Sequence, residues 1–170
     1  MTSCNRTAVL AGTAMLAVAL SAGTAHAAPV TTSADAKAKV LKQISVTKSA
    51  DLEFGTVVVG TAAGTVGVAS DGTLACDAAL TCTGSTSAAG FTISGSKNEF
   101  VTITGDNSVT LKNADDSTKT MTASLSRSAG SLKLGTTGSG TFTVGGTLSV
   151  GASQTDGLYS GAFNVTVNYQ

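Results

Sequence analysis

Residues 157–170 read GLYSGAFNVTVNYQ, in which larger apolar side chains alternate with small or polar ones. The odd positions are Tyr159, Gly161, Phe163, Val165, Val167 and Tyr169, and the even positions are Ser160, Ala162, Asn164, Thr166 and Asn168. Side chains of a β-strand point alternately to its two faces, so one face of this segment is apolar and the other polar. We predict one strand over 158–169, about twice the usual strand length, which must be embedded in a sheet.

The predicted strand over 158–169 also needs a partner that pairs with its edge or covers it. A long apolar edge without Pro or an inward charge is an aggregation hazard unless something pairs with it or covers it. The covering element is either the fold itself or another protein that adds or accepts a strand, a mode of recognition based on main-chain hydrogen bonds. Both interpretations are open from the residues alone.

The remainder of the chain predicts an all-β domain. Short alternating apolar runs are separated by Gly, Ser and Thr, and no segment after residue 27 has a helical period. We expect strands near 40–47, 52–59, 65–69, 91–94, 100–104, 109–112, 121–125, 131–134, 141–144, 147–150 and 158–169. Many short antiparallel strands in one domain over 40–170 favour an immunoglobulin-like Greek-key β-sandwich.

The amino-terminal residues predict export. Arg6 provides a positive n-region, residues 8–20 form an apolar h-region, and Ala25-His26-Ala27 is a small-x-small cleavage site. We therefore expect a helical signal peptide over 1–27 and a product that reaches the periplasm and then the cell surface or the medium. Residues 28–39 form a polar, small-residue arm, which is either a disordered leader or an extended segment able to pair with another subunit.

Two cysteines remain after that cleavage. Cys76 and Cys82 lie six positions apart in a segment bounded by Gly72 and Gly84. In an exported protein such a pair is expected to form a disulfide. The spacing is not the Cys-x-x-Cys of redox-active sites, so we predict a structural role.

Composition argues against several classes of function. His26, the only histidine, lies in the predicted signal peptide, so neither a His-dependent nucleophile nor a His-ligated zinc site is expected. Without Arg6, nine Lys and Arg face ten Asp and Glu, a net charge of about −1 that does not suit nucleic acid. No later apolar stretch is long enough for a membrane helix. We expect no enzyme, no cofactor and no metal, and we interpret Asp115-Asp116 as a solvated turn.

Two blocks of sequence carry a family resemblance. Residues 50–57 read ADLEFGTV, and residues 140–151 read GTFTVGGTLSVG, followed by GLYSG at 157–161. Together they resemble a family of uncharacterised secreted proteobacterial proteins with a domain of unknown function, which is similar to archaic chaperone–usher pilins of the spore-coat type. Gly157 and the penultimate Tyr169 resemble the carboxy-terminal pattern of these fimbrial pilins.

The resemblance implies a structural role. It implies a sandwich that lacks one strand, is bound first by a periplasmic chaperone, and is completed in a usher-assembled polymer by the amino-terminal arm of a neighbour. Strand pairing or chaperone binding would then involve Gly157, Tyr159, Gly161, Phe163, Val165, Val167 and Tyr169. The arm departs from the pilin pattern because residues 30–38 are mostly small.

The leading hypothesis is a non-catalytic, pilin-like fibre subunit with a role in cell adhesion. The alternative is a monomeric secreted β-sandwich that binds a glycan or a surface protein through its loops. An absence of Trp argues against sugar stacking in that alternative.

Overall fold

The computed structural model describes residues 27–170 and divides the chain into two units, 1–38 and 39–170. The predicted signal peptide lies outside the described residues, except for Ala27. In the first unit, residues 27–38 have no regular secondary structure and are exposed. Among the described residues, no helix has the length and apolarity required to cross a membrane.

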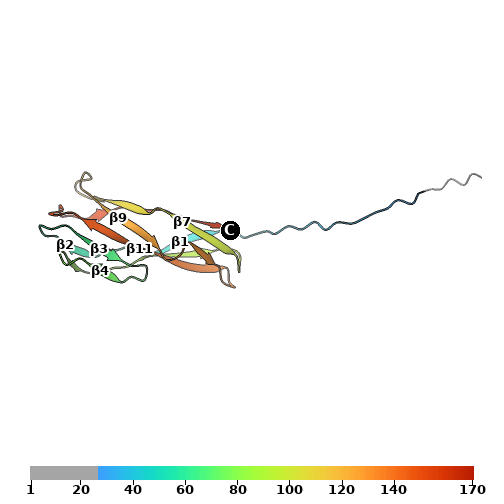
Figure 1. Cartoon of the computed structure of the whole chain (residues 1–170), viewed down its shortest axis with the longest axis horizontal. Coiled ribbons are helices and arrows are strands. Elements are labelled where there is room, and N and C mark those ends of the chain that lie inside the picture. Colours follow the sequence, from blue (N-terminus) through green and yellow to red (C-terminus); the bar gives the residue numbers. More distant parts are fainter. Residues whose placement is uncertain (1–26) are drawn as a thin grey trace, which may run out of the picture. The chain divides into compact units, whose positions relative to one another are not determined.

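Residues 39–170 are all-β, as predicted, and their strands pair in antiparallel sheets (Figure 1). The strands are β1 (Ser45–Ala50), β2 (Thr56–Val58), β3 (Gly64–Val68), β4 (Leu74–Cys76), β5 (Thr81–Thr83), β6 (Ala89–Ser94), β7 (Phe100–Gly105), β8 (Ser108–Asn113), β9 (Thr120–Arg127), β10 (Ser131–Lys133), β11 (Ser139–Val150), β12 (Tyr159–Ser160) and β13 (Val165–Tyr169).

The largest sheet has eight strands and is organised by β11. Its main path is β1-β6-β11-β9-β8-β12, with β3 paired to β11 and β4 to β3. Residues 139–144 of β11 pair with β6, and residues 146–150 pair with β3. β9 pairs with residues 144–149 of β11. The predicted strands 141–144 and 147–150 are therefore one strand. Gly145-Gly146, which we interpreted as a break, instead lets β3 approach, because a Cβ at Gly145 would collide with the carbonyl oxygen of Val68.

Two smaller sheets contain the remaining strands. One has the order β10-β7-β13, and the other consists of β2 and β5. The predicted strand 40–47 is displaced, because β1 covers 45–50, and the predicted strand 52–59 is shortened to β2.

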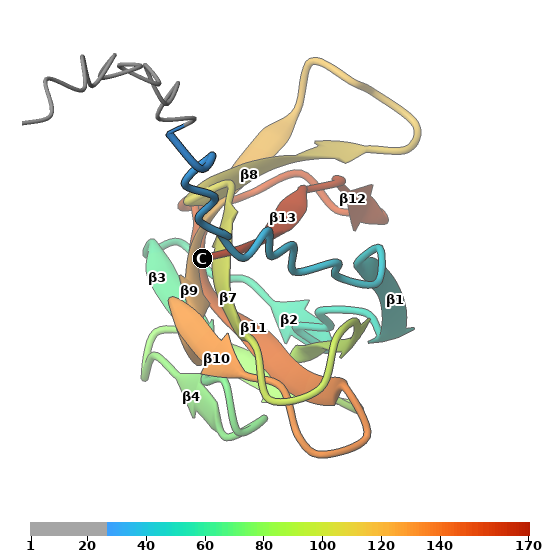
Figure 2. The ribbon, with the colours of Figure 1, turned by 90° about the vertical axis from the view of Figure 1, so that its right-hand side faces the viewer.

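The prediction of one strand over 158–169 is wrong, because this segment changes sheets. β12 pairs with β8 in the large sheet, whereas β13 pairs with β7 in the three-stranded sheet (Figure 2). The connection is tight: a Cβ at Gly161 would lie 2.5 Å from the carbonyl oxygen of Thr110. At the turn into β13, Asn164 N–H donates to the Asp106 carboxylate (2.8 Å) and Asp106 N–H donates to the Asn164 carbonyl (3.0 Å).

The predicted two-sidedness of this segment is confirmed although its continuity is not. Tyr159, Phe163, Val165, Val167 and Tyr169 are half-buried, whereas every even-numbered residue from 158 to 170 is exposed. Among the apolar residues at even positions, Leu158 is 73% exposed. Period two thus determined which side chains face the interior.

The core consists of two clusters. The first is buried around Phe54, Val66, Val68, Leu80, Val109, Ala123, Leu148 and Val150. The second is buried around Ala89, Ile93, Val101, Ile103, Leu134, Phe142 and Val144. Leu52, Leu125 and Phe163 pack against both clusters and connect them.

The Cys76–Cys82 disulfide is confirmed. Cys76 ends β4 of the large sheet, and Cys82 lies in β5 of the two-stranded sheet. The bond therefore ties the β2–β5 pair to the large sheet, in addition to closing one loop.

We predict that replacing both cysteines with Ser lowers the free energy of unfolding by about 2 kcal/mol, the loop-closure contribution for so short a loop. Chemical denaturation of both proteins under oxidising conditions measures this difference. Hydrogen exchange in β2 is expected to accelerate more than in β9, and equal acceleration in the two strands would contradict a local tie.

Candidate functional site

The strand β13 has one unpaired edge. Gln170 N–H donates to the Phe100 carbonyl (3.1 Å), and Asp106 N–H donates to the Asn164 carbonyl at the other end of the strand. Because directly opposed residues of antiparallel strands alternate between bonded and non-bonded pairs, even-numbered residues make the ladder to β7. The main-chain groups of Val165, Val167 and Tyr169 consequently point to the opposite edge, along which the described residues provide no strand.

The apolar face of β13 is also incompletely covered. Val165 and Val167 are half-buried and pack against the second core cluster, as do Ile44 and Val46 at the start of β1. β1 is itself an edge strand, paired with β6 alone. Two sheet edges with partly exposed apolar side chains therefore adjoin the same cluster.

An aromatic group lies beside this face. Phe91 stacks on Phe142 with ring centroids 5.1 Å apart, and Phe163 meets Phe91 edge-on at 6.4 Å. Phe142 is buried, whereas Phe91 and Phe163 are half-buried. The aromatic contact thus extends from the core to the partly open surface.

The hydroxyl of Tyr169, in β13, makes hydrogen bonds near the start of β1. It donates to the Lys42 carbonyl (2.6 Å) and accepts from Ser96 N–H (2.6 Å). Lys42 N–H in turn donates to Ser96 Oγ (2.7 Å). Gly95 leaves room for the phenol ring, since a Cβ there would lie 2.5 Å from its oxygen. Tyr169 therefore joins β13 to the segment that precedes β1.

A second anchor holds the loop before β12. Asn113 is 3% exposed, and its Nδ2 donates to the Asp156 carbonyl (2.9 Å). Its Oδ1 accepts from the amides of Asp115 (2.9 Å) and Asp116 (3.2 Å). Gly157, with a φ of 131°, packs directly on this amide, and a Cβ there would lie 2.5 Å from Nδ2.

The seven residues predicted for strand pairing therefore form two groups. Gly157, Tyr159 and Gly161 lie along β8, whereas Phe163, Val165, Val167 and Tyr169 lie along β7. Sequence reasoning missed Asn113 and Lys42, which bind these groups. The run Asn113-Ala114-Asp115-Asp116 carried a usable signal, because an Asn side chain commonly accepts from the backbone two residues on.

The acidic residues of the turns have structural partners. Asp116 Oδ1 accepts from the hydroxyl (2.6 Å) and the amide (2.9 Å) of Thr118, and these bonds lower the pKa of its carboxyl below the usual value. The amide of Thr73, followed by its hydroxyl, likewise lowers the pKa of Asp71. No three His, Cys, Asp or Glu residues gather into a metal-binding group within residues 27–170.

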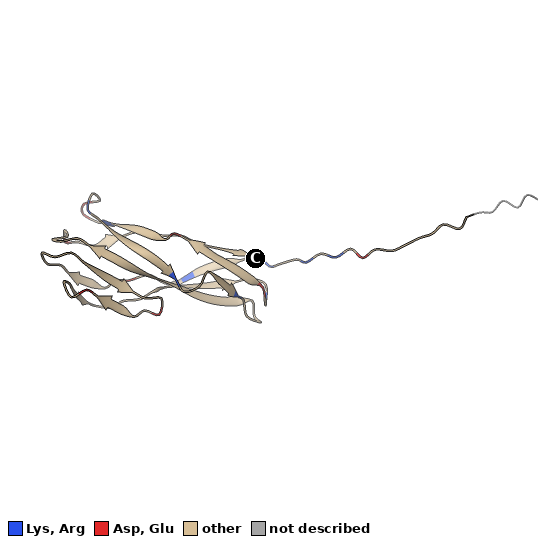
Figure 3. Cartoon of the chain, in the orientation of Figure 1, with Lys and Arg blue, Asp and Glu red and all other residues tan. Residues whose placement is uncertain are grey.

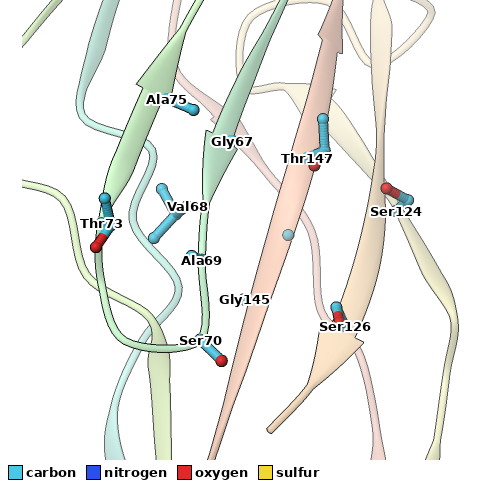
Figure 4. A pocket seen from close by; sticks show the side chains of 11 residues that line it. Gly67, Val68, Ala69, Ser70, Thr73, Ala75, Ser124, Ser126, Gly145 and Thr147 are labelled. Carbon is cyan, nitrogen blue, oxygen red and sulfur yellow. The ribbon is translucent and has the colours of Figure 1, made fainter.

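A shallow cavity of about 410 Å³ crosses the large sheet from the turn before β4 to β9 (Figure 4). Small side chains line it, among them the hydroxyls of Ser70, Thr73, Ser124, Ser126 and Thr147. No aromatic residue is among the described residues that line it. Its chemistry is that of a hydrogen-bonding surface without a stacking platform.

Comparison with known proteins gives one match. The model of a family described as a domain of unknown function (DUF4402) matches residues 44–169. No curated protein and no solved structure matches the chain. The matched range contains all thirteen described strands, including both groups of predicted residues.

We predict that Tyr169→Phe costs about 1–2 kcal/mol of stability, because Ser96 N–H and the Lys42 carbonyl lose a partner. Thermal unfolding monitors the loss, and hydrogen exchange at Ser96 is expected to accelerate. Thr166→Val in the same strand is the control, since its side chain faces solvent. An unchanged exchange rate at Ser96 would contradict the role assigned to the hydroxyl.

We predict that Gly157→Ala costs about 1–3 kcal/mol, because a side chain is strained at positive φ and the added Cβ meets Asn113. Gly130→Ala provides the matched control, as nothing lies within 4 Å of its added Cβ. Denaturant titration compares the two variants. Equal stabilities of the two variants would show that the contact with Asn113 does not require glycine at position 157.

Proposed function

The chain belongs to the DUF4402 family, a domain of unknown function, and on that premise we propose that it is a non-catalytic, pilin-like fibre subunit. In this proposal the protein is exported to the periplasm and then displayed at the cell surface as part of a fimbrial fibre that serves adhesion. Its last strand binds an assembly chaperone or packs the subunit core. The single observation that carries the proposal is the unpaired, half-covered edge of β13.

The proposed fold is an immunoglobulin-like Greek-key sandwich with an incomplete second layer. Support comes from the division of the strands outside the large sheet into β2–β5 and β10-β7-β13. A strand added along β13 gives hydrogen-bond partners to Val165, Val167 and Tyr169 and covers the apolar side chains beside them. Burial of each additional methylene contributes about 0.8 kcal/mol.

The proposed occupants of this edge are a strand of a periplasmic chaperone and, later, residues 28–39 of a neighbouring copy delivered by an usher. Residues 28–39 are exposed and hold no regular structure in the isolated chain, as a donor segment requires. Their side chains are mostly Ala, Thr and Ser, so most of the affinity is expected from the main chain.

No enzymatic activity is part of the proposal. Its support is the sequence, in which His26 is the only histidine, so that a Ser-His or Cys-His pair has no base after signal cleavage. The alternative function, a monomeric sandwich that binds a glycan, is favoured by one observation. The hydroxyl-lined cavity across β3, β11 and β9 offers partners to sugar hydroxyls.

The experiment compares two pairs of variants in the exported protein. Val165→Asp places a carboxylate on the apolar face of β13, whereas Thr166→Asp places it on the exposed face of the same strand. Val167→Pro removes an amide from the unpaired edge, and Val167→Ala keeps that amide while reducing the side chain. We expect a heat-stable ladder on denaturing gels and filaments in electron micrographs for the wild type, Thr166→Asp and Val167→Ala.

Val165→Asp and Val167→Pro are expected to remove the ladder because they block the added strand. Circular dichroism identifies any variant that has unfolded, and Val167→Pro leaves the ladder to β7 intact. A wild-type protein that remains monomeric with or without a chaperone would refute the proposal. Binding on a glycan array that is lost in Ser124→Val would then favour the alternative.

A further inference from the structure

A second cavity, of about 570 Å³, lies on the apolar side of the large sheet near β12. Residues 154–159 line it together with nine apolar residues: Leu52, Phe54, Val57, Val58, Val59, Leu111, Met121, Leu148 and Val150. Its volume falls within the range of small-molecule sites, which combine apolar walls with a few polar groups.

The wall formed by residues 151–159 is held in place by hydrogen bonds. Ser153 N–H donates to the Gly60 carbonyl (2.9 Å), which fastens this wall to the segment after β2. Gln154 Nε2 donates to the Tyr159 hydroxyl (2.8 Å), which donates to the Thr155 carbonyl (2.8 Å). Asn113 binds the Asp156 carbonyl, so the wall is anchored to the rest of the fold at two places and braced internally by Tyr159, which indicates a preformed cavity.

The opposite wall is fixed as well. Glu53, which lies between Leu52 and Phe54, exchanges backbone hydrogen bonds of 2.8 and 3.1 Å with Ser87. Further along, β2 pairs with β5, which carries the Cys82 end of the disulfide. These bonds hold both walls in place on either side of the cavity.

The charge around the cavity has one sign. Glu53 and Asp156 are its charged lining residues, and none of the described residues that line it is Lys or Arg. Few positions along the strands are occupied by charged residues (Figure 3). Glu53 and Asp156 are both exposed, and acidic side chains beside an apolar cavity attract a cation and repel an anion.

From the preformed apolar cavity and its acidic rim we propose a binding site for an amphiphile with an elongated apolar tail and a cationic head. The tail lies against Val57, Leu111 and Met121, and the head lies near Glu53 and Asp156. Anionic amphiphiles such as fatty acids are disfavoured. The proposal does not depend on fibre assembly, since the cavity belongs to a single chain.

The test is a titration of the purified protein with dodecyltrimethylammonium, dodecyl maltoside and dodecanoate, each below its micelle concentration. Met121 is the only methionine after residue 15, so its labelled methyl group is assigned by Met121→Leu. We expect a saturable shift of this signal. The affinity is expected to be about tenfold higher for the ammonium than for the carboxylate, and the difference should shrink at high salt.

Variants separate the tail from the head. Val57→Trp fills the cavity and, in a protein without Trp, also reports on it by fluorescence, so binding of all three amphiphiles should be lost. Leu74→Trp on β4, outside the cavity, is expected to bind normally. The double change Glu53→Gln and Asp156→Asn is expected to abolish the preference for the cation while tail binding persists, whereas Asp35→Asn should preserve the preference.

Several results would overturn the proposal. They are a methyl signal that does not saturate, equal binding to Val57→Trp, or equal affinity for dodecanoate and the ammonium at low salt. If Val57→Trp does not fold, the salt-dependent preference read at Met121 in the wild type decides the question. Polymers formed by a protein that fails to bind any amphiphile would leave the fibre proposal intact and refute this one.

Discussion

The eight-stranded sheet has an apolar face that must be kept from water, and residues 39–170 cover it with separate pieces of chain. Val57 and Cys82 of the β2–β5 pair pack against the first core cluster, and Val101 and Ile103 of β7 belong to the second. Hydrophobic burial is the main stabilising term in folding. The apolar face is thus covered by separate strands. The half-buried side chains along β13, the Phe91–Phe163 contact and the cavity beside β12 lie where these strands leave it partly open.

The segment after β11 shows how the chain meets this constraint. β12 adds to the large sheet, and the chain then crosses at Gly161 and the Asp106–Asn164 pair to place β13 beside β7. The crossing brings Phe163 into contact with both core clusters. A segment that stayed within one sheet would have left the second cluster without its contribution.

Much of the architecture was predictable because period two is a local property. It identified the all-β class and the faces of residues 157–170, and the spacing of Cys76 and Cys82 indicated their disulfide. Which strand pairs with which is not a local property. The alternation at 158–169 is the same whether the segment pairs within one sheet or within two. Gly145-Gly146 separated two predicted strands, 141–144 and 147–150, but here these glycines permit close approach of β3. Asn113 was missed because its burial depends on Gly157.

The long strand β11 has a kinetic consequence. Its partners β3, β6 and β9 all precede it in the chain. Val68, for example, pairs with Gly146, which lies far along the sequence. Domains dominated by such distant pairings fold slowly, because chain entropy is lost before the contacts compensate for it. Until β11 is in place, the earlier strands expose unpaired edges, and β13 arrives later still. A chain of this topology passes through an interval in which its unpaired strand edges are open to aggregation.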